Sequence, residues 1–166
     1  MLYTIINSFS PADEDSWNTY CNWRGIQFGR FDSIDGILRP SLIDPIEDED
    51  WEHVVNEDFM LHLITNIKYA RKRLAGLGKG DLLAIKFEDH DTEDHAFLGF
   101  DIIDGYYNDS LLSNWGNDVD VVNNHIGSNA LIKEFKDIEY VYKYLKEKHI
   151  EDDHVADCKI VSIYKT

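Results

Sequence analysis

The residues best suited to metal or acid–base chemistry lie between Glu88 and His95, in the run EDHDTEDH. This run, which we call the acidic connector (residues 88–95), holds five carboxylates and two histidines. Imidazole nitrogen and carboxylate oxygen both ligate divalent metals, but the spacing matches no established motif. A complete site would need further ligands, such as His62 or His125. We therefore expect an exposed acidic loop and no metal or cofactor, while a hydrolase or metal-dependent enzyme using residues 90–95 remains an alternative.

Other candidate groups for catalysis have ordinary structural interpretations. The two cysteines, Cys21 and Cys158, lie in no signature of a nucleophilic thiolate, and we expect reduced, buried thiols, although a single bridge between them stays open. Three glycines around Lys79 follow a helical pattern and precede a strand pattern, the reverse of the order in a phosphate-binding loop. We expect them to end a helix, and we predict that the protein has no catalytic residues and is not an enzyme.

A second acidic run, IEDEDWEH, surrounds Trp51 with carboxylates, and we call it the first acidic segment (residues 46–53). Tryptophan is enriched among the residues that dominate protein interfaces, while nearby charges steer a partner of opposite sign. A core position for Trp51 is the alternative. The residues predicted to contact a partner, from both acidic runs, are Asp48, Glu49, Asp50, Trp51, Glu52, Asp89, Asp91, Glu93 and Asp94.

The charge of the chain narrows the kind of partner. Thirty-two Asp and Glu against sixteen Lys and Arg give a net charge of −16, with thirteen acids and three bases in residues 1–60 and eleven acids and one base in residues 81–128. Long-range attraction to nucleic acid or to an anionic membrane is disfavoured, and a cationic partner is favoured, although such charge also aids solubility. No stretch approaches the roughly 20 apolar residues of a membrane span, and no signal peptide is recognisable, so we expect a cytoplasmic protein.

Two apolar runs flank the acidic connector and must position it. Alternate residues share a face in each run, Leu83 with Ile85 and Phe100 with Ile102, which is the period-two pattern of β-strands. We expect the two strands to pair as a hairpin at the centre of a sheet. The acidic connector would then project from the end of that hairpin.

The remaining elements predict a single α+β domain over residues 1–166. In chain order we expect a strand at 2–6, a helix from Ser10 to Trp23, a strand at 26–31, a helix begun by Asn56 and ended by Gly76 and Gly78, a helix begun by Asp137, and a strand at 160–164. Because the helices are unevenly spaced and two strands form a hairpin, this order indicates a mainly antiparallel sheet of about five strands with about three helices packed on it.

The segment FLGFDIIDGYYNDSLLSNWG, residues 97–116, resembles part of the immunity proteins of bacterial contact-dependent and polymorphic toxin systems. Small size, acidity and an α+β fold agree with that resemblance. It implies a protein that binds a cognate toxin domain, often a nuclease, and blocks its active site. A nuclease cleft must attract a polyanion, so an acidic protein surface can occupy the same electrostatic field. An acidic adaptor with a different partner remains an alternative.

The two acidic runs are expected to lie at opposite ends of the sheet, so that one compact partner covers only one of them. We favour the first acidic segment, because Trp51 gives it a large aromatic anchor that the acidic connector lacks in sequence.

Overall fold

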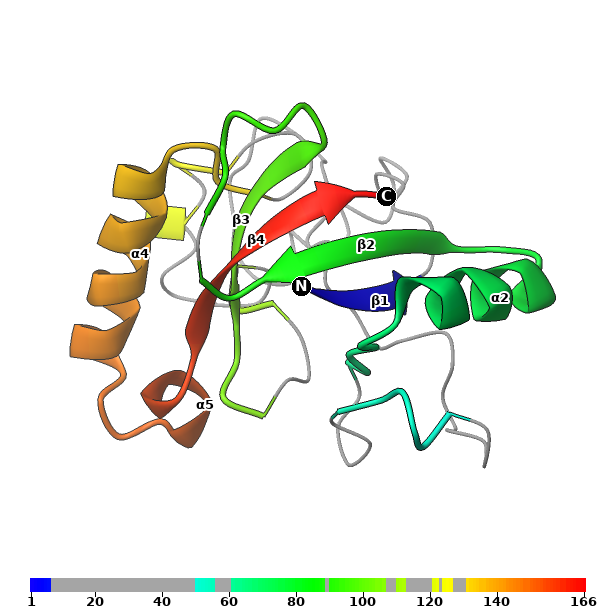
Figure 1. Ribbon diagram of the computed structural model, residues 1–166. Helices are drawn as coiled ribbons and strands as arrows, with labels where there is room; N and C mark the ends of the chain where they lie inside the picture. The colour runs from blue at the N-terminus through cyan, green and yellow to red at the C-terminus, as the bar shows by residue number, and fades with distance from the viewer. Residues whose placement is uncertain are drawn as a thin grey trace, which may run out of the picture.

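A computed structural model gives the fold and describes residues 1–6, 50–55, 61–88, 90–106, 110–112, 121–122, 124–126 and 131–166. Its elements are β1 (Leu2–Ile6), α2 (Ile67–Leu77), β2 (Asp81–Lys86), β3 (Phe97–Ile103), α4 (Phe135–Lys148), α5 (Asp153–Ala156) and β4 (Lys159–Lys165) (Figure 1). The α+β class is confirmed, with a four-stranded antiparallel sheet in this part of the chain instead of about five strands. The helix expected at 10–23 and the strand expected at 26–31 lie outside the described residues.

The strand order β1-β2-β4-β3 shows that the predicted hairpin is wrong. The C-terminal strand β4 lies between β2 and β3 and pairs antiparallel with both, through Ile85 opposite Ile163 on one side and Phe100 opposite Ser162 on the other. Because β2 and β3 both run against β4, they are parallel to each other. The ten residues between them must therefore return along the sheet instead of making a turn at its end.

Single bridges continue the sheet beyond both of its edge strands. Tyr3 on β1 pairs with Ile64, which also pairs with Val54. On the opposite edge Phe100 of β3 pairs with Ile132. The described part of the first acidic segment is thus held at the β1 edge of the sheet.

Helix α2 begins eleven residues in sequence after Asn56, which corrects the predicted helix start. Residues 61–66 are not helical, and Ile64 forms a bridge with β1. Asn66 is the N-cap, since its side-chain oxygen accepts hydrogen bonds from the backbone N–H groups of Lys68 and Tyr69 at 2.9 and 3.2 Å. The helix ends as predicted at Gly78, whose positive φ of 66° suits glycine.

Helix α4 begins at Phe135, so Asp137 lies in its first turn and is not its N-cap. A carboxylate there still favours the helix, because the N-terminal end carries partial positive charge. Its inward face carries the buried Ile138, Val141 and Leu145. The short helix α5 was not predicted. None of the described helices is long and apolar enough to cross a lipid bilayer.

Both longer helices cover the same face of the sheet. Paired residues in neighbouring strands share a face, so Ile5, Leu82 and Phe100 all point to one side. Ile5 and Leu82 pack with Tyr69 and Ala70 of α2, whereas Phe100 packs with the buried residues of α4. The strip of β4 between the two helices is therefore available to other parts of the chain. The opposite face packs against Leu61, Leu63 and Leu131.

Candidate partner-binding surface

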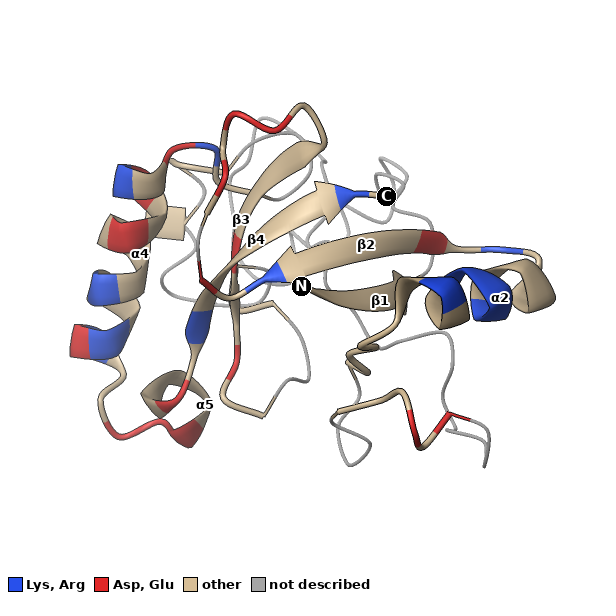
Figure 2. Ribbon diagram, viewed as in Figure 1, with Lys and Arg blue, Asp and Glu red and all other residues tan. Residues whose placement is uncertain are grey.

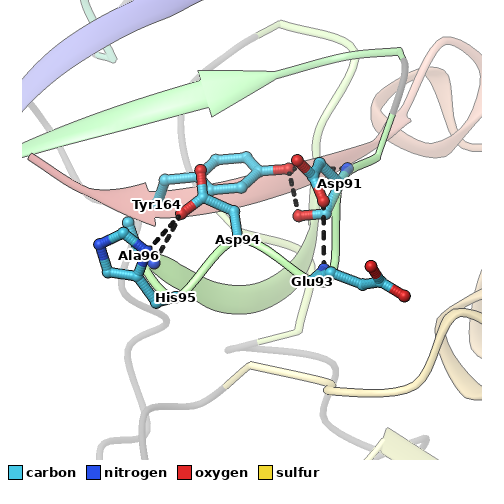
Figure 3. Close-up of polar contacts among 6 residues, drawn as sticks. All are labelled: Asp91, Glu93, Asp94, His95, Ala96 and Tyr164. Carbon is cyan, nitrogen blue, oxygen red and sulfur yellow. Dashed lines mark hydrogen bonds and ion pairs between the residues drawn. The ribbon is translucent and has the colours of Figure 1, made fainter.

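The acidic connector lies across β4 on the face that carries the helices. Two hydrogen bonds fix it there: the backbone N–H of Asp91 donates to the hydroxyl of Tyr164, and that hydroxyl donates to the carbonyl of Asp91, both at 3.1 Å (Figure 3). At its end the backbone N–H of Lys165 donates to the carbonyl of Ala96 at 2.8 Å. The expectation of a projecting hairpin loop is therefore wrong, because the connector must return over β4 to start β3.

Two aspartates of the acidic connector also hold its shape. Asp91 Oδ1 accepts a hydrogen bond from the backbone N–H of Glu93 at 3.1 Å, and Asp94 Oδ1 accepts one from that of Ala96 at 2.8 Å. Such local bonds stabilise turns. Asp91 and Glu93 are nevertheless exposed, and the Glu93 side chain extends away from the other residues drawn (Figure 3). The connector thus presents carboxylates from a backbone that is already fixed.

An exposed aromatic ring lies beside the acidic connector. His90 contacts the Ser162 hydroxyl through Nδ1, and its ring centroid is 5.4 Å from that of Phe135. Phe135 opens α4, packs on the buried Phe100 ring at 5.5 Å and is still 44% exposed. An exposed aromatic ring therefore lies beside the acidic connector too, although the connector's own sequence has none. The sequence could not reveal this contact, because Phe135 is 45 residues from His90 in the chain and only folding brings the two rings together.

The first acidic segment is only partly a surface feature. Asp50 is 0% exposed, and its carboxylate accepts a hydrogen bond from the Tyr69 hydroxyl and pairs with Arg73, with Nε 3.0 Å from Oδ1. The interpretation of Asp50 as a partner contact is therefore corrected: its charge is used inside the fold. Trp51 is 54% exposed, which excludes the core alternative, and Glu52 is exposed. Asp48, Glu49 and Asp89 lie outside the described residues.

The two acidic runs occupy separate positions, one at the β1 edge and one over β4. Figure 2 shows the described carboxylates of both runs in red and the basic residues of α2 in blue. Four strand spacings separate Val54 from β4, which corresponds to roughly 19 Å at about 4.8 Å each. They therefore lie at an edge and on a face, not at the two ends that the predicted hairpin implied.

Those groups considered for catalysis that the structure describes show no reactive arrangement. No three His, Cys, Asp or Glu side chains converge as metal ligands within the described part of the chain. The Cys158 side chain is buried, and burial raises the pKa of its thiol to about 11, against a smaller lowering by Lys146. Cys158 is thus a neutral thiol at physiological pH, unsuited to nucleophilic attack.

One polar pair was missed by sequence reasoning. Nδ1 of His154 on α5 lies 2.9 Å from Oδ2 of Asp104, which is buried at the end of β3, and the Tyr106 ring contacts the imidazole with centroids 4.8 Å apart. These residues are 50 positions apart, and their residue types alone gave no reason to join them. The pair ties α5 to the sheet.

The raised pKa of Cys158 leads to a measurable prediction. In a Cys21→Ser variant, which leaves Cys158 as the sole thiol, about one molecule in a thousand should carry the thiolate at pH 8. Alkylation by iodoacetamide should be about 100-fold slower or more in the folded protein than in guanidinium. Because the folded pKa lies above the unfolded one, stability should fall as pH rises from about 9 to about 11. Equal alkylation rates would contradict the buried thiol.

No protein-family model, curated protein or solved structure matches this chain. Its function is therefore inferred from its own residues and contacts.

Proposed function

We propose that this protein is an immunity-type inhibitor, which binds a basic toxin domain and blocks its active site with an acidic surface. The observation that carries the proposal is the acidic connector: exposed carboxylates at Asp91 and Glu93 on a backbone fixed to β4, in a chain of net charge −16. The toxin domain we expect is a nuclease. In this proposal the protein acts by binding in the cytoplasm, carries out no reaction, needs no cofactor, and binds neither nucleic acid nor membrane.

A fixed acidic loop suits this role for two reasons. The basic cleft of a nuclease attracts phosphates, so exposed carboxylates experience the same field and accelerate association. A loop that is already ordered loses less conformational entropy on binding than a mobile one, so more of the interaction energy remains as affinity. The two hydrogen bonds between Asp91 and the Tyr164 hydroxyl, and the one that the Lys165 N–H donates to the Ala96 carbonyl, supply that order here.

Affinity also requires an apolar anchor, because charges at an interface rim mainly set the association rate. Phe135 can serve as this anchor beside the acidic connector, since it is half-exposed and lies against His90. Trp51 offers a second exposed ring beside Glu52. Both rings are of the residue class that forms strong interface contacts.

Two other functions are less well supported. A hydrolase using residues 90–95 would need a reactive constellation, whereas His90 packs against Phe100 and Phe135, and His95 is fully exposed beside Asp94. An acidic adaptor would share the surface but not protect cells from a toxin. Protection of toxin-expressing cells therefore separates the adaptor from the immunity protein.

Charge reversal at Glu93 tests the proposed surface. Glu93→Lys should slow association with the cognate toxin domain about 3- to 10-fold at low salt, because it reverses an exposed charge without removing a hydrogen bond that holds the loop. The wild-type association rate should itself fall between about 50 and 500 mM salt. Stopped-flow fluorescence measures both, and protection of cells gives the functional readout.

Glu147→Lys is the matched control, because Glu147 is also exposed but lies in the last turns of α4. It should change the association rate less than about 2-fold, since a distant exposed charge is screened. Equal effects of both variants would reject the acidic connector as the interface. An absence of binding and protection by the wild-type protein would reject the immunity function itself.

A further inference from the structure

A groove of about 610 Å³ opens at the end of the sheet where β2 ends and β4 begins, and we call it the end groove. Leu2, Leu63, Phe87 and Ile160 supply apolar lining. Leu63 is buried in the core, whereas Val55 at the groove is 52% exposed. The end groove therefore has a firm apolar wall and an accessible apolar side.

The end groove extends from the acidic connector to Val55, two residues after the first acidic segment. Val55 lines it and follows Trp51 and Glu52 by a few residues, while Glu88 and His90 line it from the acidic connector. Two surfaces that are roughly 19 Å apart across the sheet thus share one concave apolar feature. A single partner segment along the groove can contact both.

The charges around the end groove indicate what it binds. Glu88 is an exposed acid in its lining, and Glu52 and Asp91 are exposed nearby in sequence on the two runs. The one cation among its described lining residues, Lys159, stands over the Phe87 ring, 5.8 Å from the centroid. An apolar floor between acidic ends is complementary to a segment with an apolar stripe and flanking Lys or Arg.

A helix of the partner can span this separation. At 1.5 Å per residue, roughly 13 helical residues span roughly 19 Å, which is between three and four turns. Amphipathic helices commonly bind by laying their apolar face into such a groove. A volume of this size also lies within the range of about 300–1,000 Å³ of small-molecule sites, so a small apolar ligand is the competing occupant.

We infer that the end groove binds an amphipathic, cationic helix of the partner protein. The inference rests on the proposed function in that this partner is the toxin domain. It assigns the apolar part of the interface to the end groove and leaves the acidic runs to attract and orient the basic flanks. One partner then covers both acidic runs, contrary to the expectation from the sequence.

A synthetic peptide tests the end groove without any toxin. The probe is a 14-residue amphipathic helix of Leu and Lys, with a Lys/Ser peptide of equal charge and a Leu/Glu peptide as comparisons. Methyl-labelled protein is titrated with each peptide and observed by NMR. The Leu/Lys peptide should shift the methyl signals of Leu2, Val55 and Leu63 and bind at least 10-fold more tightly than either comparison. Equal binding of the Lys/Ser peptide would overturn the inference, since charge alone would then suffice.

Substitutions at Val55 localise the effect. Val55→Lys should weaken binding of the Leu/Lys peptide at least 10-fold, and Val55→Ser should weaken it without adding charge. Ile150→Lys is the matched control, since Ile150 is a 78% exposed aliphatic residue outside the end groove, and it should change binding less than 2-fold. Unchanged binding in both Val55 variants, with normal melting temperatures, would overturn the inference.

Three further outcomes are decisive. If anilinonaphthalene sulfonate shifts the groove methyl signals and the Leu/Lys peptide does not, the groove is a small-molecule site and the inference is wrong. If Val55→Lys protects cells as well as the wild type, the proposed function stands and the groove has no part in it. If the peptide binds as expected and no toxin is neutralised, the groove assignment stands and the immunity function fails.

Discussion

Asp50→Ala is expected to lower the free energy of unfolding by about 3–5 kcal/mol, although the residue belongs to a run of surface-like acids. The carboxylate is fully buried, pairs with Arg73 and accepts a hydrogen bond from the Tyr69 hydroxyl. Its removal leaves a largely buried guanidinium without this counter-charge and a buried hydroxyl without this acceptor. Both losses are costly, because burial removes the water that would otherwise solvate these groups.

Urea denaturation followed by circular dichroism measures the effect, and Glu52→Ala is the matched control. Glu52 is two residues away and exposed, so its removal should change stability by no more than about 0.5 kcal/mol. If Asp50→Ala were as mild as Glu52→Ala, Asp50 would face solvent and return to the candidate interface. A large loss of stability in Asp50→Ala and a small one in Glu52→Ala would assign Asp50 to the core and Glu52 to the surface.

Gly99→Ala is expected to destabilise the protein by at least about 3 kcal/mol. Gly99 has a φ of 147°, which side chains rarely adopt, and it lies where the register between β3 and β4 shifts. A Cβ there would approach the Leu131 Cβ to 2.7 Å and the Ile132 carbonyl oxygen to 3.1 Å. Neither neighbour can yield easily, because Leu131 is buried and Ile132 pairs with Phe100.

Gly76→Ala provides the comparison from the same chain. Gly76 lies within α2, and a Cβ there would meet nothing within 4 Å. Alanine should stabilise the helix by about 0.5–1 kcal/mol, because it loses less backbone entropy than glycine on folding. The melting temperature should therefore fall in Gly99→Ala and rise in Gly76→Ala. A Gly99→Ala protein as stable as the wild type would show that β3 and the 131–132 segment are more loosely packed than described.

Local sequence pattern predicted the strands but not their neighbours. The alternation in β2 and β3 correctly identified which residues share a face, since side-chain direction in a strand has period two. This alternation does not indicate which strands are neighbours in the sheet. The position of β4 between β2 and β3 could therefore not be predicted from it. Helix α2 shows the same limit, because Leu63 and Ile67 have helical spacing although the chain around Ile64 pairs with β1.

The candidate surface was predictable only in part. Exposure of Asp91 and Glu93 follows from their polar run, as the sequence predicted. Burial of Asp50 does not, because its partners Tyr69 and Arg73 are 19 and 23 residues away in the chain. The approach of Phe135 to His90 likewise depends on how α4 docks on β3, which no local pattern specifies.

The central position of β4 has a consequence for synthesis on the ribosome. Residues 159–165 bridge β2 and β3, so the two sides of the sheet stay unjoined until this stretch has left the exit tunnel. Until then β2 and β3 each present an unpaired backbone edge, the kind of surface on which chains aggregate. Nascent chains should therefore be prone to aggregation until synthesis is complete, and a chain that stalls before residue 159 should be proteolysed more readily than the full-length protein. Any C-terminal degradation tag on such a chain would act on a protein that has not yet closed its sheet.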